Sequence, residues 1–188
     1  MPTTARTGLQ HISLVPAAPA HQQIIANLLQ FYIYDFSEIM PLELGPDGRF
    51  QYPELPRYWS ESSRFPFLAA ANGKWVGLVF VKQVQSTNDQ RPVWDMAEFF
   101  VLRGYRRLGL GTRLAHLTFQ RFPGAWQIRV MESNAVARYF WEKAIEDFIG
   151  TVPEAIRVNV EGASRYNFRF ESKAGLNRGP DTLIPSRG

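Results

Sequence analysis

The chain has 188 residues, of which 45% are hydrophobic and 20% are charged, and it contains no cysteine. These values are typical of a globular domain with an adequate core, and they exclude disulfides, thiolate catalysis and cysteine-ligated metal sites. The formal net charge of +4 is too small and too dispersed to indicate a protein whose whole surface binds nucleic acid.

Neither a metal site nor a membrane segment is predicted. The three histidines, His11, His21 and His116, do not have the spacing of metal ligands. No apolar run approaches the roughly 18 residues of a membrane span, and residues 1–10 lack the apolar core of a signal peptide. We therefore expect a cytoplasmic protein that makes no membrane contact.

The first predicted elements are a short strand over residues 11–17 and a helix over residues 21–39, which Pro16 and Pro19 separate. Apolar residues recur in the helix at steps of three and four, and we interpret this stripe as core-facing. It consists of Ile24, Ile25, Leu28, Leu29, Tyr32 and Ile33.

Residues 40–66 are rich in proline, glycine and aromatic residues, which predicts a long loop with a short helix near Trp59. Long loops in compact domains often bind ligands. The alternative is that the aromatic side chains only pin the loop to the core. They are Phe50, Tyr52, Tyr58 and Trp59.

Three consecutive strands are predicted next. Residues 65–84 form two strand-like runs around Asn72-Gly73, a dipeptide suited to the positive φ angles of a type I′ hairpin turn. Residues 93–102 are rich in Phe, Val and Trp and complete an antiparallel meander.

The pattern then changes to a helix over 109–122, a strand over 125–131, a helix over 133–148 and a closing strand over 163–172. We expect one domain over residues 1–172 and a disordered polar tail over residues 173–188. The predicted fold class is α/β (α+β): a mixed central sheet in which an antiparallel N-terminal meander precedes strand–helix–strand–helix, with helices on both faces.

The turn at the start of the predicted helix over 109–122 has the features of a diphosphate site. Gly109 and Gly111 allow the backbone to come close to phosphate oxygens, and the first amides of a helix lack internal partners. Arg106, Arg107 and Arg113 add positive charge. The alternative is a tight turn with solvated side chains. Walker A and Rossmann loops are excluded, because the first needs Gly-Lys-Ser/Thr and the second needs a glycine at the position of Leu114.

This stretch resembles the acetyl-CoA loop of the GNAT superfamily of N-acetyltransferases, whose pattern is Arg/Gln-X-X-Gly-X-Gly/Ala. Arg106, Gly109 and Gly111 occupy those places. A second family feature is an asparagine followed by alanine and an aromatic pair, matched by Asn134, Ala137, Phe140 and Trp141. The resemblance covers roughly residues 12 to 170 and includes the order of the elements.

The resemblance implies that acetyl-CoA is the co-substrate. Its pyrophosphate would lie on the backbone from Arg106 to Thr112, and its pantetheine arm would lie between the strand backbone and Asn134. A backbone amide near Phe99 to Val101 would polarise the thioester carbonyl. The implied contact residues are Phe99, Val101, Arg106, Arg107, Leu108, Gly109, Leu110, Gly111, Thr112 and Asn134.

One departure from the family concerns the general acid. Many relatives have tyrosine as the second residue of the aromatic pair, where its hydroxyl can protonate the leaving thiolate, whereas this chain has Trp141. Tyr139 lies about 200° away around the helix and does not replace it. Ile145 and Glu146 replace the usual Gly-Phe at the end of this helix.

Glu98 is the candidate general base, because it lies on the strand beside the expected thioester and the attacking amine must be neutral. The alternative is a strand-face glutamate that reaches solvent or pairs with an arginine. Asp95 and Glu132 are weaker candidates that we expect to be surface or pairing residues, and His116 is expected to be exposed or to pack.

These features predict an N-acetyltransferase that moves acetyl from acetyl-CoA to a primary amine, of a small molecule or a peptide, by direct attack in a ternary complex. The missing tyrosine leaves a non-catalytic CoA-binding or regulatory module open as the alternative. Nucleic-acid binding through the arginines is less favoured, and a homodimer is left open.

Overall fold

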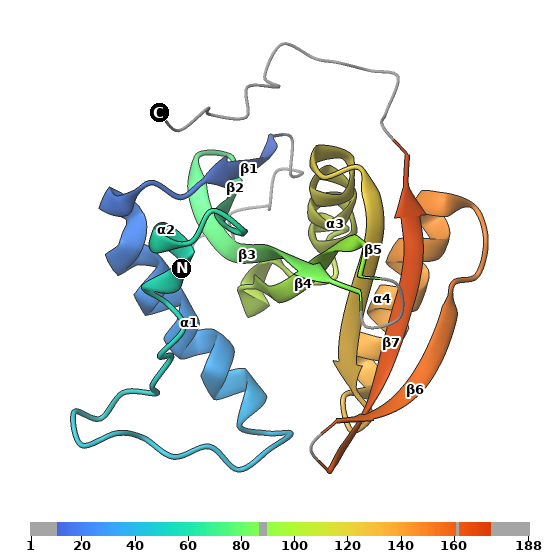
Figure 1. The fold of residues 1–188 in the computed structure, drawn as a ribbon. Helices are drawn as coiled ribbons and strands as arrows, with labels where there is room; N and C mark the ends of the chain where they lie inside the picture. The colour runs from blue at the N-terminus through green and yellow to red at the C-terminus, as the bar shows by residue number, and fades with distance from the viewer. Residues whose placement is uncertain (1–10, 87–89, 161, 174–188) are drawn as a thin grey trace.

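The structure is a computed structural model that describes residues 11–86, 90–160 and 162–173 (Figure 1). The elements are β1 (Ile12–Pro16), η1 (Pro19–His21), α1 (Gln22–Phe36), α2 (Arg57–Ser60), β2 (Arg64–Ala71), β3 (Lys74–Gln85), β4 (Pro92–Val101), η2 (Arg103–Tyr105), α3 (Leu110–Arg121), β5 (Gly124–Met131), α4 (Ala135–Ile149), β6 (Glu154–Val160) and β7 (Ala163–Ser172).

The strands form one mixed sheet in the order β1-β2-β3-β4-β5-β7-β6. The β4–β5 pair is parallel and the other pairs are antiparallel, so the predicted fold class is confirmed. The hairpin turn is also confirmed, because Asn72 and Gly73 have φ angles of 48° and 74°. The short helix near Trp59 is α2. The predicted disordered tail, apart from Lys173, lies outside the described residues, and the single domain over 1–172 stays a prediction.

Helices cover both faces of the sheet (Figure 1). The predicted stripe of α1 packs on one face, where Ile25 and Leu29 join Leu68, Leu78 and Phe80 in an apolar cluster. A second cluster lies on the other face beneath α3 and α4, and it includes Phe119, Trp126, Trp141, Ile145 and Phe168. Burial of these side chains supplies most of the driving force for folding.

β6 was not predicted from the sequence. It is the edge strand beyond β7 and pairs with it from Glu154↔Arg169 to Val160↔Ala163. Its signal was present as the alternation of Ile156, Val158 and Val160 with polar Arg157 and Asn159.

β4 and β5 separate soon after they meet. Their paired residues are Trp94↔Trp126 and Asp95↔Gln127, both near the start of the two strands. The remaining residues of β4, up to Val101, have no ladder partner on the β5 side. We call this divergence the splay. It exposes backbone groups of β4 that a regular sheet would pair.

A bulge in β4 sets the direction of the side chains at the splay. Phe80 pairs with Glu98 and Val81 pairs with Met96, so Ala97 is the extra residue. Beyond the bulge, Glu98 and Phe100 face α1, whereas Phe99 and Val101 face α3 and α4. One strand therefore presents a carboxyl group to one face and its free backbone edge to the splay.

Candidate active site

The junction between β4 and α3 presents unpaired backbone amides. Gly109 precedes α3, and its φ of 74° lies in the left-handed region that glycine adopts without strain. No side chain caps this helix end, and Arg113 N donates the first bond of the helix, to Gly109 O, at 3.1 Å. The amides of residues 110–112 therefore have no partner within the described part of the chain, and the helix dipole adds partial positive charge there.

The two glycines of the turn have different physical roles. A Cβ on Gly109 would meet no atom within 4 Å, so space does not require glycine there. The positive φ angle of this residue does. A Cβ on Gly111 would lie 3.1 Å from Phe140 Cε2, so this glycine makes room for a ring of α4. The sequence predicts that both glycines let the backbone approach phosphate, and the contact with Phe140 is a second reason for glycine at position 111.

The arginines of the turn divide into two groups. Arg107 and Arg113 are exposed and form no ion pair with any described residue, and Arg107 has a positive φ of 60°. Arg106 instead donates from Nε to the Val101 carbonyl at 2.7 Å, and its guanidinium pairs with Asp35 of α1. Arg103 also pairs with Asp35, at 2.8 Å.

The Arg106 side chain has a structural role in addition to the one that the sequence predicts. The sequence predicts that its charge contributes to the anion site, and in the structure its side chain ties the end of β4 to α1. Asp35 carried no signal in the sequence, because it lies 71 residues before Arg106. Leu108, also in the turn, is 45% exposed. It can contact a ligand only through its backbone and its apolar side chain.

The backbone of β4 faces the splay at Phe99 and Val101. Leu102 N donates to Val76 O of β3 at 2.8 Å, and groups in an antiparallel ladder alternate in direction. The amides of Phe99 and Val101 therefore point away from β3 and toward the splay. The Val101 carbonyl accepts the bond from Arg106, which leaves its amide for another partner.

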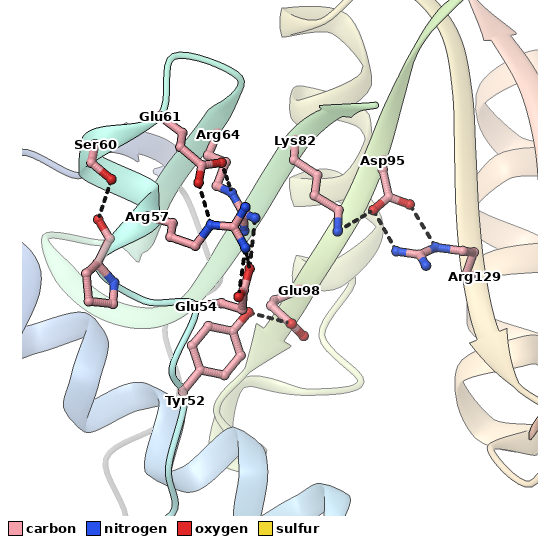
Figure 2. Close-up of polar contacts among 11 residues, drawn as sticks. Tyr52, Glu54, Arg57, Ser60, Glu61, Arg64, Lys82, Asp95, Glu98 and Arg129 are labelled. Atoms are coloured by element: carbon pink, nitrogen blue, oxygen red, sulfur yellow. Dashed lines mark hydrogen bonds and ion pairs between the residues drawn. The ribbon is translucent and has the colours of Figure 1, made fainter. Parts of the chain in front are cut away.

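Glu98 lies on the α1 face of the sheet, beside Tyr52 (Figure 2). The Tyr52 hydroxyl, from the long loop, donates to Glu98 Oε1 at 2.7 Å. Burial raises the pKa of Glu98 above its ordinary value, and the hydroxyls of Tyr32 and Tyr52 only partly oppose that shift. Burial and the nearby carboxyl raise the pKa of Tyr58 to about 12. A buried carboxyl with a raised pKa suits a proton acceptor that works near neutral pH.

The other acidic candidates have ion-pair partners. Asp95 is fully buried, and Arg129 Nη2 lies 2.8 Å and Lys82 Nζ 3.6 Å from its Oδ2 (Figure 2). Glu132 pairs with Arg157 at 2.7 Å. Both contacts fit the pairing roles that were expected. Two acids of the long loop also have partners: Glu54 pairs with two arginines, and Asp47 accepts from Arg49 N and Gln51 Nε2.

The start of α4 lies near the turn through Phe140, the ring next to Gly111. Asn134 caps this helix, because its Oδ1 accepts from Ala137 N at 2.9 Å, which leaves the Nδ2 group as its free donor. Trp141 is 6% exposed and packs 4.9 Å, between ring centroids, from both Phe99 and Phe140. Tyr139 is 67% exposed and points away from this core.

His116 is a packing residue. Its Nε2 lies 2.9 Å from the Ala144 carbonyl, and its ring contacts Phe119 and Phe148. Among the described residues, no group of three or more His, Cys, Asp or Glu side chains could hold a metal ion. The helices in the described ranges include none long and apolar enough to span a membrane.

Comparison with known proteins identifies the family of this chain and the solved structures that share its fold. The model of the acetyltransferase (GNAT) family matches residues 30–145, more than half of the chain. No curated protein sequence matches the chain significantly.

Several solved structures share the fold. An acetyltransferase from Thermus thermophilus is 15% identical with a TM-score of 0.62, covering 88% of this chain and 99% of that one. The aminoglycoside acetyltransferase AAC(6')-Ib in complex with coenzyme A is 17% identical with a TM-score of 0.64, covering 87% and 96%. Arabidopsis thaliana NAA60 in complex with acetyl-CoA is 12% identical with a TM-score of 0.58, covering 86% and 98%.

Proposed function

The chain belongs to the acetyltransferase (GNAT) family, and from this premise we propose that it transfers the acetyl group of acetyl-CoA to a primary amine by direct attack. Similar folds have been solved with acetyl-CoA and with coenzyme A, which supports acetyl-CoA as the donor. The observation that carries the proposal is the uncapped N-terminus of α3 beside the splay. It combines free amides, two unpaired arginines and a free strand edge.

The pyrophosphate of coenzyme A binds at the start of α3 in this proposal. The amides of residues 110–112 donate to its oxygens, and the helix dipole favours negative charge. Arg107 and Arg113 supply further charge from the protein surface. Arg106 acts indirectly, because its pair with Asp35 holds the turn against α1.

The pantetheine arm lies along β4 in the splay. The amides of Phe99 and Val101 bind it as a neighbouring strand would, and Asn134 Nδ2 donates from the other side. One of these strand amides donates to the thioester carbonyl and stabilises the oxyanion that forms when the amine attacks.

Glu98 accepts the proton of the attacking amine, directly or through a water molecule. The amine nitrogen forms a bond to the thioester carbon, the oxyanion collapses, and the carbon–sulfur bond breaks with its electron pair on sulfur. No cysteine is present to form a thioacyl intermediate. The thiolate leaves without a side-chain acid, because Trp141 replaces the tyrosine of many relatives. A thiolate can leave without protonation because it is a fairly good leaving group, as the pKa of about 8.5 of a free thiol indicates.

The same absence of tyrosine favours a second candidate, a module that binds coenzyme A without catalysis. Thiol release separates the two. Purified protein is mixed with acetyl-CoA and a panel of amino acids, polyamines, aminoglycosides and peptides, and free thiol and acetylated product are both measured. Equal release of thiol and product supports the transferase. Tight binding of acetyl-CoA without product from any amine class supports the module. Cytoplasmic location and a homodimer stay predictions.

A further inference from the structure

Two neighbouring side chains on β7 have buried polar atoms without partners. They are Nε of Arg165 and Oδ1 of Asn167, and the described residues contain no other buried side-chain nitrogen or oxygen in this state. Asn167 is 6% exposed. An unsatisfied buried polar atom costs about 1 to 3 kcal/mol, so each one in a native protein needs a physical explanation, and a bound ligand would supply it here.

Both residues lie on the sheet face that also carries Glu98. Phe168 and Phe170 of β7 pack beneath α3 and α4, so Arg165 and Asn167 alternate to the opposite face. Figure 1 shows α4 behind β5 and β7, with α1 and α2 on the other half of the molecule.

The register brings Asn167 level with Glu98. Asp95 of β4 pairs with Gln127 of β5, and Glu98 lies two paired positions further along β4, because Ala97 is the extra residue of the bulge. Arg129 lies two residues beyond Gln127 on β5 and pairs with Asn167. Glu98 and Asn167 therefore lie at one level on either side of the splay, and Arg165 lies two residues further along on the same face of β7. Two strand spacings of about 4.8 Å separate β4 from β7 by roughly 10 Å or more.

The charge of Arg165 is available to a ligand. Arg129, the neighbouring arginine of β5, makes two hydrogen bonds to Asp95 through Nε and Nη2. The Arg165 side chain forms no ion pair or hydrogen bond with any residue that the structure describes. A guanidinium with no acidic partner, beside a carbonyl oxygen that needs a donor, matches a ligand with a carboxylate next to an N–H group.

We propose that the acceptor is a short peptide or amino-acid derivative with a free carboxylate, which Arg165 binds while Asn167 Oδ1 accepts its adjacent N–H. The inference rests on the proposed function and names the acceptor class. An extended peptide of three residues spans about 10 Å, which matches the distance from Glu98 to β7. Purely cationic acceptors lack the group that Arg165 would bind.

Triglycine and triglycinamide test the proposal, because they differ only in the terminal carboxylate. Thiol release gives kcat/KM for each peptide with the wild type, Arg165→Gln and the control Arg157→Gln. Arg157 pairs with Glu132 and lies on β6 opposite Tyr166, on the other face of the sheet, so its variant makes the same charge change away from the site. The wild type and Arg157→Gln should prefer triglycine about tenfold or more, and Arg165→Gln should lose that preference.

Calorimetry with CoA and the two acetylated peptides gives a readout that does not need turnover. The carboxylate site is supported if the wild type binds N-acetyltriglycine more tightly than its amide and Arg165→Gln loses this difference. This holds even if no thiol is released. In that case the proposed transfer fails and the site stands. Equal binding and equal turnover of the two peptides by the wild type overturn the inference. An unchanged preference in Arg165→Gln overturns it as well.

Discussion

At the scale of single residues, the surroundings of the Glu98 carboxyl determine its pKa. Burial raises its pKa, while the hydroxyls of Tyr32 and Tyr52 stabilise the ionised form and lower it. Since a general base acts in its ionised form, activity should fall as the pH drops through the raised pKa of Glu98. In the proposed mechanism, burial and the tyrosines together set the lower pH limit of the reaction.

Tyr52→Phe removes one of these donors. The pKa of Glu98 should rise further, the acidic limb of the kcat/KM profile should move to higher pH, and activity at neutral pH should fall about threefold to tenfold. Tyr34→Phe, at a side chain that is 64% exposed on α1, is the control. A profile in Tyr52→Phe that superimposes on that of Tyr34→Phe would show that the hydrogen bond does not tune the base.

Trp141 illustrates a buried residue at the position of a missing acid. Because it packs against Phe99 and Phe140, Trp141→Phe should lower the free energy of unfolding by about 1 to 3 kcal/mol and keep kcat within about tenfold. Urea unfolding and steady-state kinetics measure the two effects. A stable variant that binds acetyl-CoA normally yet loses more than about a hundredfold in kcat would identify Trp141 as part of the chemistry.

At the scale of elements, the splay depends on one ion pair at its base. Asp95 of β4 binds Arg129 and Gln127 of β5 just where the parallel pairing ends. Asp95→Asn removes the buried carboxylate of this pair and leaves the partly exposed cations Arg129 and Lys82, so the free energy of unfolding should fall by about 1 to 3 kcal/mol. Glu132→Gln, which breaks the exposed pair with Arg157, should change it by less than about 1 kcal/mol. Similar values for the two variants in urea unfolding would contradict this role.

The turn before α3 allows a matched test of the phosphate site. Gly109 and Gly48 have φ angles of 74° and 71°, and a Cβ on either would meet no atom within 4 Å. Gly109→Val and Gly48→Val therefore introduce similar backbone strain, about 1 to 3 kcal/mol. Gly109→Val should weaken acetyl-CoA binding at least tenfold, because it redirects the first amides of α3, and Gly48→Val should leave it unchanged. Equal affinities by calorimetry would remove the turn from the site.

Local patterns predicted most of these elements. The period of α1, the Asn72-Gly73 turn and the glycine turn before α3 each depend on residues close in sequence. The bulge at Ala97 and the splay were not predictable, because they come from pairing between distant strands. The contacts of Glu98 with Tyr52 and of Arg106 with Asp35 join residues 46 and 71 positions apart, which no local pattern reveals.

At the scale of the whole molecule, the proposed reaction has its two substrates on different parts of the sheet. In this proposal, coenzyme A uses the backbone donors of the α3 N-terminus and the splay, and the acceptor uses the face with Glu98 and Arg165. The sequence predicts the first of these sites, because a helix start and a glycine turn are local features. The second combines residues of the long loop, β4 and β7, which only the tertiary arrangement brings to one face.

The catalytic role of Glu98 is the central claim, and the pH–rate profile of Glu98→Gln tests it most directly. The raised pKa means that the folded state disfavours the ionised carboxyl, so the stability associated with its protonated form is lost as the pH rises. Glu98→Gln should therefore be as stable as the wild type, or more stable, at neutral pH.

In steady-state kinetics with acetyl-CoA and an accepted amine, Glu98→Gln should lower kcat by about 10² to 10⁴, abolish the acidic limb of the profile and keep acetyl-CoA affinity within about twofold. A folded variant with wild-type turnover and an unchanged acidic limb would contradict the account.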